Sequence, residues 1–191
     1  MKTGLFFGSF NPVHIGHMII ANHMLQYTDL EEVWMVVSPH NPLKNKVSLA
    51  KDSDRLHLVH LAIDDHPRIK ASNVEFSLPV PSYTIDTLAH LTEKYPKREF
   101  CLIMGGDNLS SIDKWKNYET LLSKYDIYVY LRPGYPSENA ALYPRVKIVE
   151  HVPMMDISAT FIRNAIKDKK SVQYLVPEKV YDYLQTSNMY K

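Results

Sequence analysis

Short apolar runs alternate along this chain with longer segments in which apolar residues recur at helical spacing. The short runs predict buried strands, because a run of about four to eight apolar residues suits a strand that is covered on both faces. These runs occupy residues 4–7, 31–37, 100–104, 126–131 and 146–149, and residues 69–76 have weaker strand character. The longer segments predict helices over 18–25, 53–63, 84–95 and 172–185, and Ser158 is expected to be the N-cap of a further helix.

The alternation of strands and helices predicts the fold class. A strand, a helix and a second strand in succession form a βαβ unit, with parallel strands and a right-handed crossover. We therefore predict an α/β fold with a Rossmann-like parallel sheet and helices on both faces. The length of 191 residues suits a single domain, with a Rossmann-like core over 1–154 and a small C-terminal helical part over 155–191.

Composition and charge exclude several classes of protein. The formal net charge of +1 gives no global basic field, so bulk electrostatics do not favour nucleic acid as a partner. No apolar stretch reaches the roughly 18 residues of a membrane span, and the first residues lack the pattern of a secretory signal. The single cysteine, Cys101, lies in a predicted strand and suits a buried position. These features predict a cytoplasmic protein that binds neither a membrane nor nucleic acid.

One segment links the first predicted strand to the first predicted helix, and it reads Gly8-Ser9-Phe10-Asn11-Pro12-Val13-His14-Ile15-Gly16-His17. A helix start offers unpaired amides and the positive end of the helix dipole, which suit a phosphate. His14 and His17 share one face of this first turn. His57 and His60 have the same spacing without this context, and we expect an ordinary surface or core role for them.

The chain contains neither a Walker loop nor a Gly-x-Gly-x-x-Gly fingerprint. Backbone amides, histidines and basic residues from elsewhere must then hold the phosphates of a nucleotide. Lys44 and Lys46 follow the second predicted strand and can reach a triphosphate, although a solvated loop explains them equally well. Gly105 lets a ligand approach the backbone closely. Asp107 either accepts hydrogen bonds from ribose hydroxyls or caps a helix that begins at Leu109.

Aromatic, basic and hydroxyl side chains supply the remaining candidates. Trp115 stands between two lysines and either stacks on a flat ring or packs partly under Tyr118. Arg132 follows a predicted strand and can clamp a phosphate. The start of the late helix forms a second predicted anion site, which comprises Ser158, Thr160 and Arg163.

The segment 8–17 resembles the signature of the HxGH nucleotidyltransferases, and the Gly-Ser-Phe-Asn-Pro-Val-His form resembles the nicotinate-mononucleotide adenylyltransferases in particular. Residues 82–88 (Ser-Tyr-Thr-Ile-Asp-Thr-Leu), 132–134 (Arg-Pro-Gly) and 157–163 (Ile-Ser-Ala-Thr-Phe-Ile-Arg) are similar to further motifs of that family. The resemblance covers nearly the whole chain. It implies an enzyme of NAD biosynthesis that transfers AMP from ATP to nicotinate mononucleotide and releases pyrophosphate. It also implies Mg²⁺ carried with ATP, and we expect no dedicated metal site on the protein.

The resemblance assigns roles to individual residues. It implies that the catalytic residues are His14, His17 and Lys44. It implies that the nucleotide is bound by Gly8, Ser9, Phe10, Gly105, Asp107, Ser158, Thr160 and Arg163. It implies that the pyridine substrate is bound by Tyr83, Thr84, Trp115 and Arg132. The chain departs from the family pattern at Leu43, where a histidine is usual, and the role of the earlier His40 stays open.

Three alternatives stay open at this point. A sister enzyme that adenylylates phosphopantetheine or cytidylylates an alcohol phosphate would share the signature, but residues 83–88 and Trp115 argue against it. A nicotinamide mononucleotide adenylyltransferase also stays open. A metal hydrolase would need a carboxylate or a third histidine beside His14 and His17. A non-catalytic nucleotide sensor would bind ATP without turnover. The pattern does not decide between nicotinate and nicotinamide, and it is compatible with a homo-oligomer.

Overall fold

The computed structural model describes residues 1–39, 49–131 and 142–191. These residues form a six-stranded sheet in the order β3-β2-β1-β4-β5-β6, in which all neighbouring strands are parallel. The strands are β1 (Lys2–Gly8), β2 (Glu32–Val37), β3 (Ile69–Ser72), β4 (Glu99–Gly105), β5 (Ile127–Tyr130) and β6 (Val146–Val149). The predicted Rossmann-like parallel sheet is confirmed.

The direction in which the chain fills the sheet reverses beside β1. Strands β2 and β3 extend the sheet on one side of β1. The chain then returns and places β4 against the other side of β1. In open α/β sheets, ligands bind in the crevice outside the carboxyl ends of the strands at such a switch point. Residues 9–14 follow β1 and Gly105 ends β4, so both lie at this switch point.

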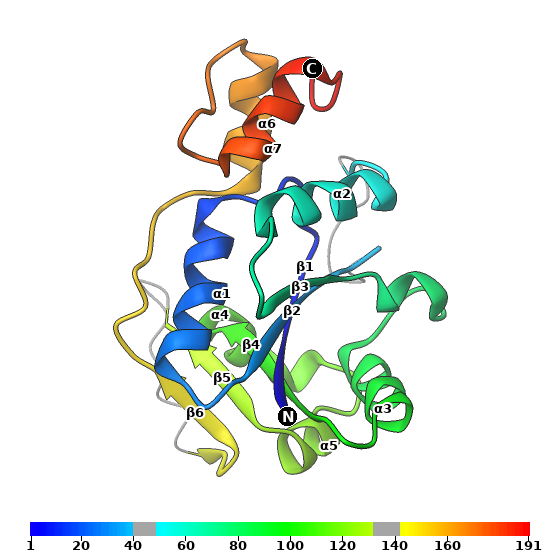
Figure 1. Ribbon diagram of the computed structural model, residues 1–191. Coiled ribbons are helices and arrows are strands. Elements are labelled where there is room, and N and C mark those ends of the chain that lie inside the picture. The colour runs from blue at the N-terminus through cyan, green and yellow to red at the C-terminus, as the bar shows by residue number, and fades with distance from the viewer. Residues whose placement is uncertain (40–48, 132–141) are drawn as a thin grey trace.

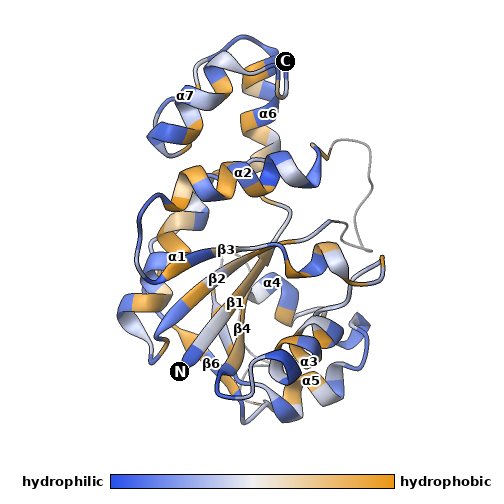
Figure 2. Ribbon diagram, turned by 45° about the vertical axis from the view of Figure 1, so that its right-hand side comes forward, coloured by the Kyte–Doolittle hydropathy of each residue, from blue (hydrophilic) through white to orange (hydrophobic). Residues whose placement is uncertain are grey.

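Helices cover both faces of the sheet. The longer ones are α1 (Ile15–Tyr27), α2 (Asp52–Ile63), α3 (Thr84–Lys94) and α5 (Tyr118–Lys124). Phe6 and Ile103 belong to one core, which lies under α1 and α2, whereas Leu5 and Leu102 belong to a second core under α3 and α5. Successive strand residues point to opposite faces, so continuous apolar runs fill both cores. Figure 2 shows the resulting hydrophobic strands between helices with hydrophilic outer faces.

Two further helices, α6 (Ala159–Lys167) and α7 (Glu178–Thr186), lie at the end of the molecule toward which the carboxyl end of β1 points (Figure 1). Their buried residues Ile162, Val180 and Leu184 belong to the same core as α1 and α2. The C-terminal helices therefore share that core, and α7 packs against α2 beyond the carboxyl ends of the strands. Cys101 is buried in that core as expected.

Three predicted element boundaries are wrong. The strand expected over 69–76 ends at Ser72, and a 3-10 helix, η1 (Val74–Ser77), follows because the Phe76 amide turns back to the Asn73 carbonyl at 2.9 Å. The helix expected from Leu109 onward instead ends there, since the short α4 spans Gly106–Leu109 and η2 (Ile112–Lys114) succeeds it. The closing helix begins at Glu178 rather than at residue 172, and Pro177 is its N-cap.

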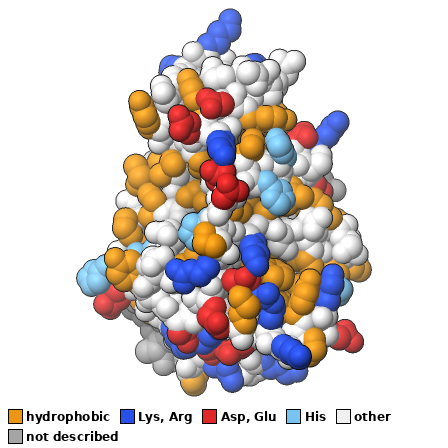
Figure 3. All heavy atoms as spheres, in the orientation of Figure 1, with side chains coloured by type: hydrophobic (Ala, Val, Ile, Leu, Met, Phe, Trp, Pro, Cys, Tyr) orange, Lys and Arg blue, Asp and Glu red, His pale blue; other side chains and the backbone are white. Residues whose placement is uncertain are grey.

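Charged side chains of both signs are mixed on the surface, as the small net charge suggests (Figure 3). At the amino ends of the strands, Asp126 accepts hydrogen bonds from Lys2 at 2.9 Å and Lys147 at 3.0 Å, and from Arg145 at 2.9 Å. Burial alone would raise the pKa of Asp126, but the hydrogen bonds from Lys2 and Lys147 outweigh it and lower the pKa from 3.8 to about 2.

None of the helices in the described ranges combines the length and apolar character needed to cross a membrane.

This network predicts a specific acid sensitivity. Because the pKa of Asp126 is lower in the folded protein than in the unfolded chain, its contribution is fully present above pH 3.8 and is lost as the pH falls through about 2. We expect Asp126→Asn to lower the free energy of unfolding by about 2 kcal/mol at pH 7, measured by urea denaturation. The difference from the wild type should shrink between pH 4 and pH 2. If Asp126→Asn, the wild type and the exposed control Asp182→Asn lost the same free energy of unfolding between pH 4 and pH 2, the lowered pKa assigned to Asp126 would be contradicted.

Candidate active site

The loop after β1 folds back on its own strand. Phe10 has a positive φ of 43° and is only 1% exposed. Its ring covers Gly8, where an added Cβ would lie 2.8 Å from the ring atoms. A side chain at this position would therefore displace Phe10 and the loop with it. The ring of Phe10 also makes an edge-to-face contact with His17, with centroids 5.0 Å apart.

The two histidines of this loop stack on each other at the start of α1. Their ring centroids lie 3.7 Å apart at an interplanar angle of 29°. His14 is the N-cap residue, and its backbone amide donates to Nδ1 of His17 at 3.2 Å. A nitrogen that accepts a hydrogen bond carries no proton, so in this geometry neutral His17 carries its proton on Nε2. Gly16 lets the pair form, because a Cβ there would lie 3.1 Å from Nδ1 of His14.

The amides at the start of α1 are partly committed to the protein itself. The His14 amide binds His17, and the Ile15 amide donates to the carbonyl of Leu175 at 3.0 Å. The expectation that the helix-start amides as a group hold a phosphate is therefore too broad. The side chains around the loop have a correspondingly larger part in any phosphate site.

Asn11 joins the loop to two distant parts of the chain. Its side-chain Oδ1 accepts from the amide of Ala50 at 3.1 Å and from the hydroxyl of Tyr190 at 2.8 Å. Its carbonyl accepts from Nη1 of Arg163 at 2.8 Å. The structure thus brings Arg163, predicted from the sequence, directly onto the histidine loop. Asn11 and Tyr190 were not among the site residues predicted from the sequence.

The other predicted residues of the late helix lie beside Arg163. Ser158 is the N-cap of α6, as expected, and its hydroxyl accepts from the amide of Phe161 at 3.1 Å. Thr160 accepts from Nη2 of Arg163 at 3.2 Å. The second predicted anion site therefore borders the histidine loop, and its hydroxyls already serve the helix start and the guanidinium.

A buried arginine, missed in the sequence, lies beneath the loop. Arg55 of α2 is 0% exposed. Its guanidinium donates to the carbonyls of Ser9, Ser38 at 2.9 Å and Ala50 at 3.1 Å, and to Asp52 at 2.6 Å. The only sequence signal is its position, since Arg55, Leu58 and Val59 are buried at i, i+3 and i+4 of one helix stripe. An arginine among the buried positions of a helix suggests that its guanidinium is bound by polar groups from other parts of the fold.

Two of the residues expected to hold the pyridine substrate lie at the start of α3, beside the segment that carries Trp115. Tyr83 is the N-cap of α3 and Thr84 its first residue. Lys116 lies with Nζ 4.7 Å from the centroid of the Tyr83 ring and 2.8 Å from Asp86 of the same helix. The neighbouring Trp115 is half-buried and packs, like Tyr118, against the second core, whereas its stacking on a ligand stays a prediction.

Gly105 and Asp107 lie at the end of β4, next to β1 in the sheet. Gly105 is the N-cap of α4, and Asp107 lies in the first turn of that helix. The alternative in which Asp107 caps a helix from Leu109 is therefore wrong. Of the other candidates, Lys44, Lys46, His40 and Arg132 lie outside the described residues.

The described residues do not combine His14 and His17 with a third metal ligand. The one group of His, Cys, Asp or Glu side chains close enough to share an ion, within the described ranges, is Glu99, Cys101 and Asp126 at the opposite end of the strands. There, the Lys2 ammonium already binds Asp126, and burial raises the pKa of the Cys101 thiol to about 12. These observations give no support to the metal hydrolase.

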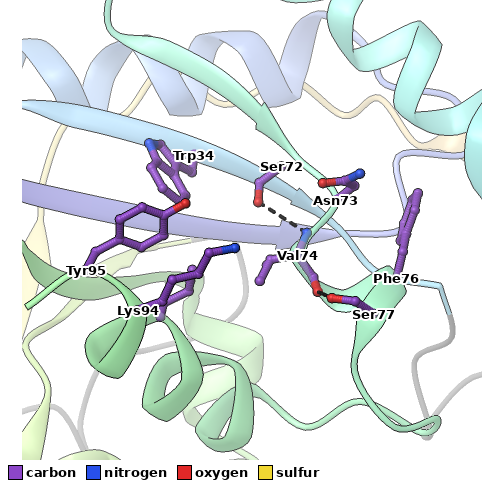
Figure 4. Close-up of a pocket in the computed structure, with 9 residues that line it drawn as sticks. Trp34, Ser72, Asn73, Val74, Phe76, Ser77, Lys94 and Tyr95 are labelled. Atoms are coloured by element: carbon purple, nitrogen blue, oxygen red, sulfur yellow. Dashed lines mark hydrogen bonds between the residues drawn. The ribbon is translucent and has the colours of Figure 1, made fainter.

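A cavity lies apart from the histidine loop. It measures about 290 Å³ and opens beside η1 and the end of α3, where Trp34 and Tyr95 lie with their rings close together (Figure 4). The rings of these two residues meet edge to face at 5.7 Å, and Lys94 and Ser72 border them. None of the predicted site residues lines this cavity.

Comparisons with known proteins identify relatives along the full length of the chain. A model of the cytidylyltransferase-like family matches residues 5–165. The "Probable nicotinate-nucleotide adenylyltransferase" of Flavobacterium johnsoniae is 53% identical over 193 residues, with 100% of both chains covered. The protein of the same name from Flavobacterium psychrophilum is 55% identical over 192 residues, again with 100% of both covered.

Solved structures share the fold. The nicotinic acid mononucleotide adenylyltransferase of Plasmodium falciparum, complexed with NaAD, superposes with a TM-score of 0.84 at 19% identity and covers 99% of this chain and 97% of its own. The same enzyme complexed with APC gives a TM-score of 0.83 at 18% identity, with coverages of 99% and 96%. At this level of identity the superposition shows a common fold.

Proposed function

We propose a mechanism and a set of site residues from one premise, that the chain belongs to the nicotinate-nucleotide adenylyltransferases within the cytidylyltransferase-like family. An enzyme of this kind is an adenylyltransferase of NAD biosynthesis. It transfers AMP from ATP to nicotinate mononucleotide and forms nicotinate adenine dinucleotide and pyrophosphate. The observation that carries the assignment of the site is the stacked pair His14 and His17, which Asn11 connects to Arg163.

The reaction needs no nucleophile from the protein. A phosphate oxygen of the mononucleotide forms the new bond to the α-phosphorus of ATP, and the bond from that phosphorus to the bridging oxygen of pyrophosphate breaks. The attacking phosphate already carries negative charge, so catalysis consists of positioning and charge stabilisation. His17, with its proton on Nε2, donates to an α- or β-phosphate oxygen as negative charge moves to the leaving group. His14 acts beside it, and Lys44, Lys46 and Arg163 share the charge of the triphosphate.

The remaining predicted residues recognise the two substrates. Gly8, Ser9 and Phe10 shape the loop around the nucleotide, whereas Gly105 and Asp107 at the end of β4 receive the adenosine. Ser158 and Thr160 hold Arg163 and the helix start against the phosphates. The pyridine mononucleotide is bound by the remaining group, which comprises Tyr83, Thr84, Trp115 and Arg132.

Mg²⁺ would enter with ATP. The site side chains described above are histidines, hydroxyls and a guanidinium, with Asp107 as the carboxylate, and this donor set fits an ion held mainly by phosphate oxygens and water. When bound, Mg²⁺ offsets the charge of the triphosphate. We further propose that the chain acts as a single nucleotidyltransferase domain in the cytoplasm, with ATP and a pyridine mononucleotide as its small-molecule partners.

The test is pyrophosphate release from ATP and Mg²⁺ with nicotinate mononucleotide, with nicotinamide mononucleotide measured in parallel. We expect a large preference in kcat/KM for the acid, because a helix start such as that of α3 favours a carboxylate. Comparable rates with both substrates would keep the reaction and remove the proposed recognition of the carboxylate. No turnover with either substrate by folded, ATP-binding protein would contradict the proposed reaction and favour a sister transferase or a sensor.

A further inference from the structure

The hydroxyl of a tyrosine in the C-terminal tail contacts the histidine loop. Tyr190 donates to Oδ1 of Asn11 at 2.8 Å, although the two residues are 179 positions apart in the sequence. The ring packs with Met189 against the first core. Burial raises the pKa of the Tyr190 hydroxyl above its usual value, although Arg163 and Arg55 lower it in part. The hydroxyl therefore remains a donor throughout the neutral pH range.

The part of the loop that receives this hydrogen bond is strained. Phe10, which immediately precedes Asn11, has a φ of 43°, a value that bulky side chains rarely adopt. Tyr190 itself has a φ of 65°. Residues in such conformations persist only where the surrounding structure holds them, and they gather at functional sites. The loop that carries His14 and His17 therefore depends on contacts from outside its own segment.

Among the described residues, three separate segments supply such contacts to Asn11. Ala50 and Tyr190 both donate to its Oδ1, and Arg163 donates to its carbonyl. Tyr190 is the only one of the three that acts through a hydroxyl, which a phenylalanine can remove without changing the ring. The packing of the C-terminal helices does not need this hydroxyl, because their own apolar residues, among them Val180 and Leu184, are buried in the core.

We propose that Tyr190 is a positioning residue for adenylyl transfer, which holds the Asn11 side chain so that the strained loop keeps the histidine pair in its reactive arrangement. The inference rests on the proposed function and adds to it a residue from the far end of the chain. Tyr190 acts through Asn11 and touches no reacting atom. Its loss should therefore lower the fraction of enzyme in the competent geometry rather than the affinity for either substrate.

The test compares Tyr190→Phe with Tyr174→Phe. Tyr174 belongs to the same C-terminal part, is 83% exposed and serves as the matched control. We expect Tyr190→Phe to lower kcat about fivefold, which is the loss of one typical hydrogen bond from the reactive arrangement. The KM values for ATP and for nicotinate mononucleotide should stay within twofold of the wild type. Tyr174→Phe should match the wild type in all three constants.

Two further measurements separate positioning from a general structural effect. In a double-mutant cycle, Tyr190→Phe should have no further effect on kcat in an Asn11→Ala background, because alanine has already removed the side chain that Tyr190 holds. Amide hydrogen exchange over residues 8–18 and at Ala50 should become faster in Tyr190→Phe and stay unchanged in Tyr174→Phe. The exchange measurement needs neither turnover nor the Asn11 variant, so it still decides the question if Asn11→Ala fails to fold.

The outcomes distinguish this proposal from the proposed function. A kcat for Tyr190→Phe within twofold of the wild type would overturn the positioning role, as would additive effects in the cycle or unchanged exchange over residues 8–18. If the wild-type protein itself does not turn over nicotinate mononucleotide, the proposed function fails, and faster exchange in Tyr190→Phe still supports the link from Tyr190 to the loop.

Discussion

Replacing His17 with alanine is expected to lower kcat by about two to three orders of magnitude, while the KM for ATP changes far less. The negative charge that His17 meets grows as pyrophosphate leaves, so its hydrogen bond is stronger in the transition state than in the substrate complex. An interaction of that kind affects kcat rather than binding. Steady-state kinetics with ATP and nicotinate mononucleotide measure both constants.

Two isosteric variants identify which nitrogen of His17 is responsible. The amide oxygen of His17→Asn can approximate Nδ1 and retain the hydrogen bond from the His14 amide, whereas His17→Gln places a donor near the position of Nε2. We expect His17→Gln to retain more activity than His17→Asn. His60→Ala is the control, because His60 is exposed on α2 and belongs to the pair with the same spacing. A kcat for His17→Ala within tenfold of the wild type would refute the catalytic role.

Arg55→Ala is expected to reduce the free energy of unfolding by about 3–5 kcal/mol, the size expected when a buried side chain that donates several hydrogen bonds is removed. The guanidinium satisfies the carbonyls of Ser9, Ser38 and Ala50 in a place that water does not reach. Alanine leaves these acceptors without a donor and also leaves a cavity at the base of the loop. The midpoint and slope of urea denaturation report the change.

Arg55→Lys is expected to lie between the wild type and alanine, because an ammonium cannot reach several carbonyls in the fixed directions of a guanidinium. Arg68→Ala is the control, since no hydrogen bond or ion pair of its side chain is found within the described parts of the chain. It should change the free energy of unfolding by less than about 0.5 kcal/mol. A similarly small change in Arg55→Ala would show that the buried guanidinium does not stabilise the fold.

The elements that were predictable are those with a local cause. Buried strands such as β4 follow from a continuous apolar run, and Ser158 was predicted as the N-cap of α6 because a serine hydroxyl suits that position. The end of β3 at Ser72 was missed, because η1 turns where the Glu75 carboxylate is buried and accepts a hydrogen bond from Thr87 of α3. The sequence around Glu75 contains no sign of that partner.

The candidate site was predictable only where residue types and their spacing carry the chemistry. The histidine pair and Arg163 meet at the loop as the motifs suggested. The residues that hold this loop in place were not predictable, because their partners are remote: Arg55 binds the Ser9 carbonyl from 46 positions away, and Tyr190 binds Asn11 from 179 positions away. Contacts over such separations depend on the completed topology rather than on local pattern.

The hydrogen bond from Ile15 to the carbonyl of Leu175 has a consequence for synthesis of the protein. The histidine loop is among the first parts of the chain to be made, and domains generally begin to fold from the N-terminal side during translation. The acceptor for the first amide of α1, however, is made only when about nine tenths of the chain exists. A nascent chain can thus form its central strands early, yet the start of α1 gains this hydrogen bond only after Leu175 has been made.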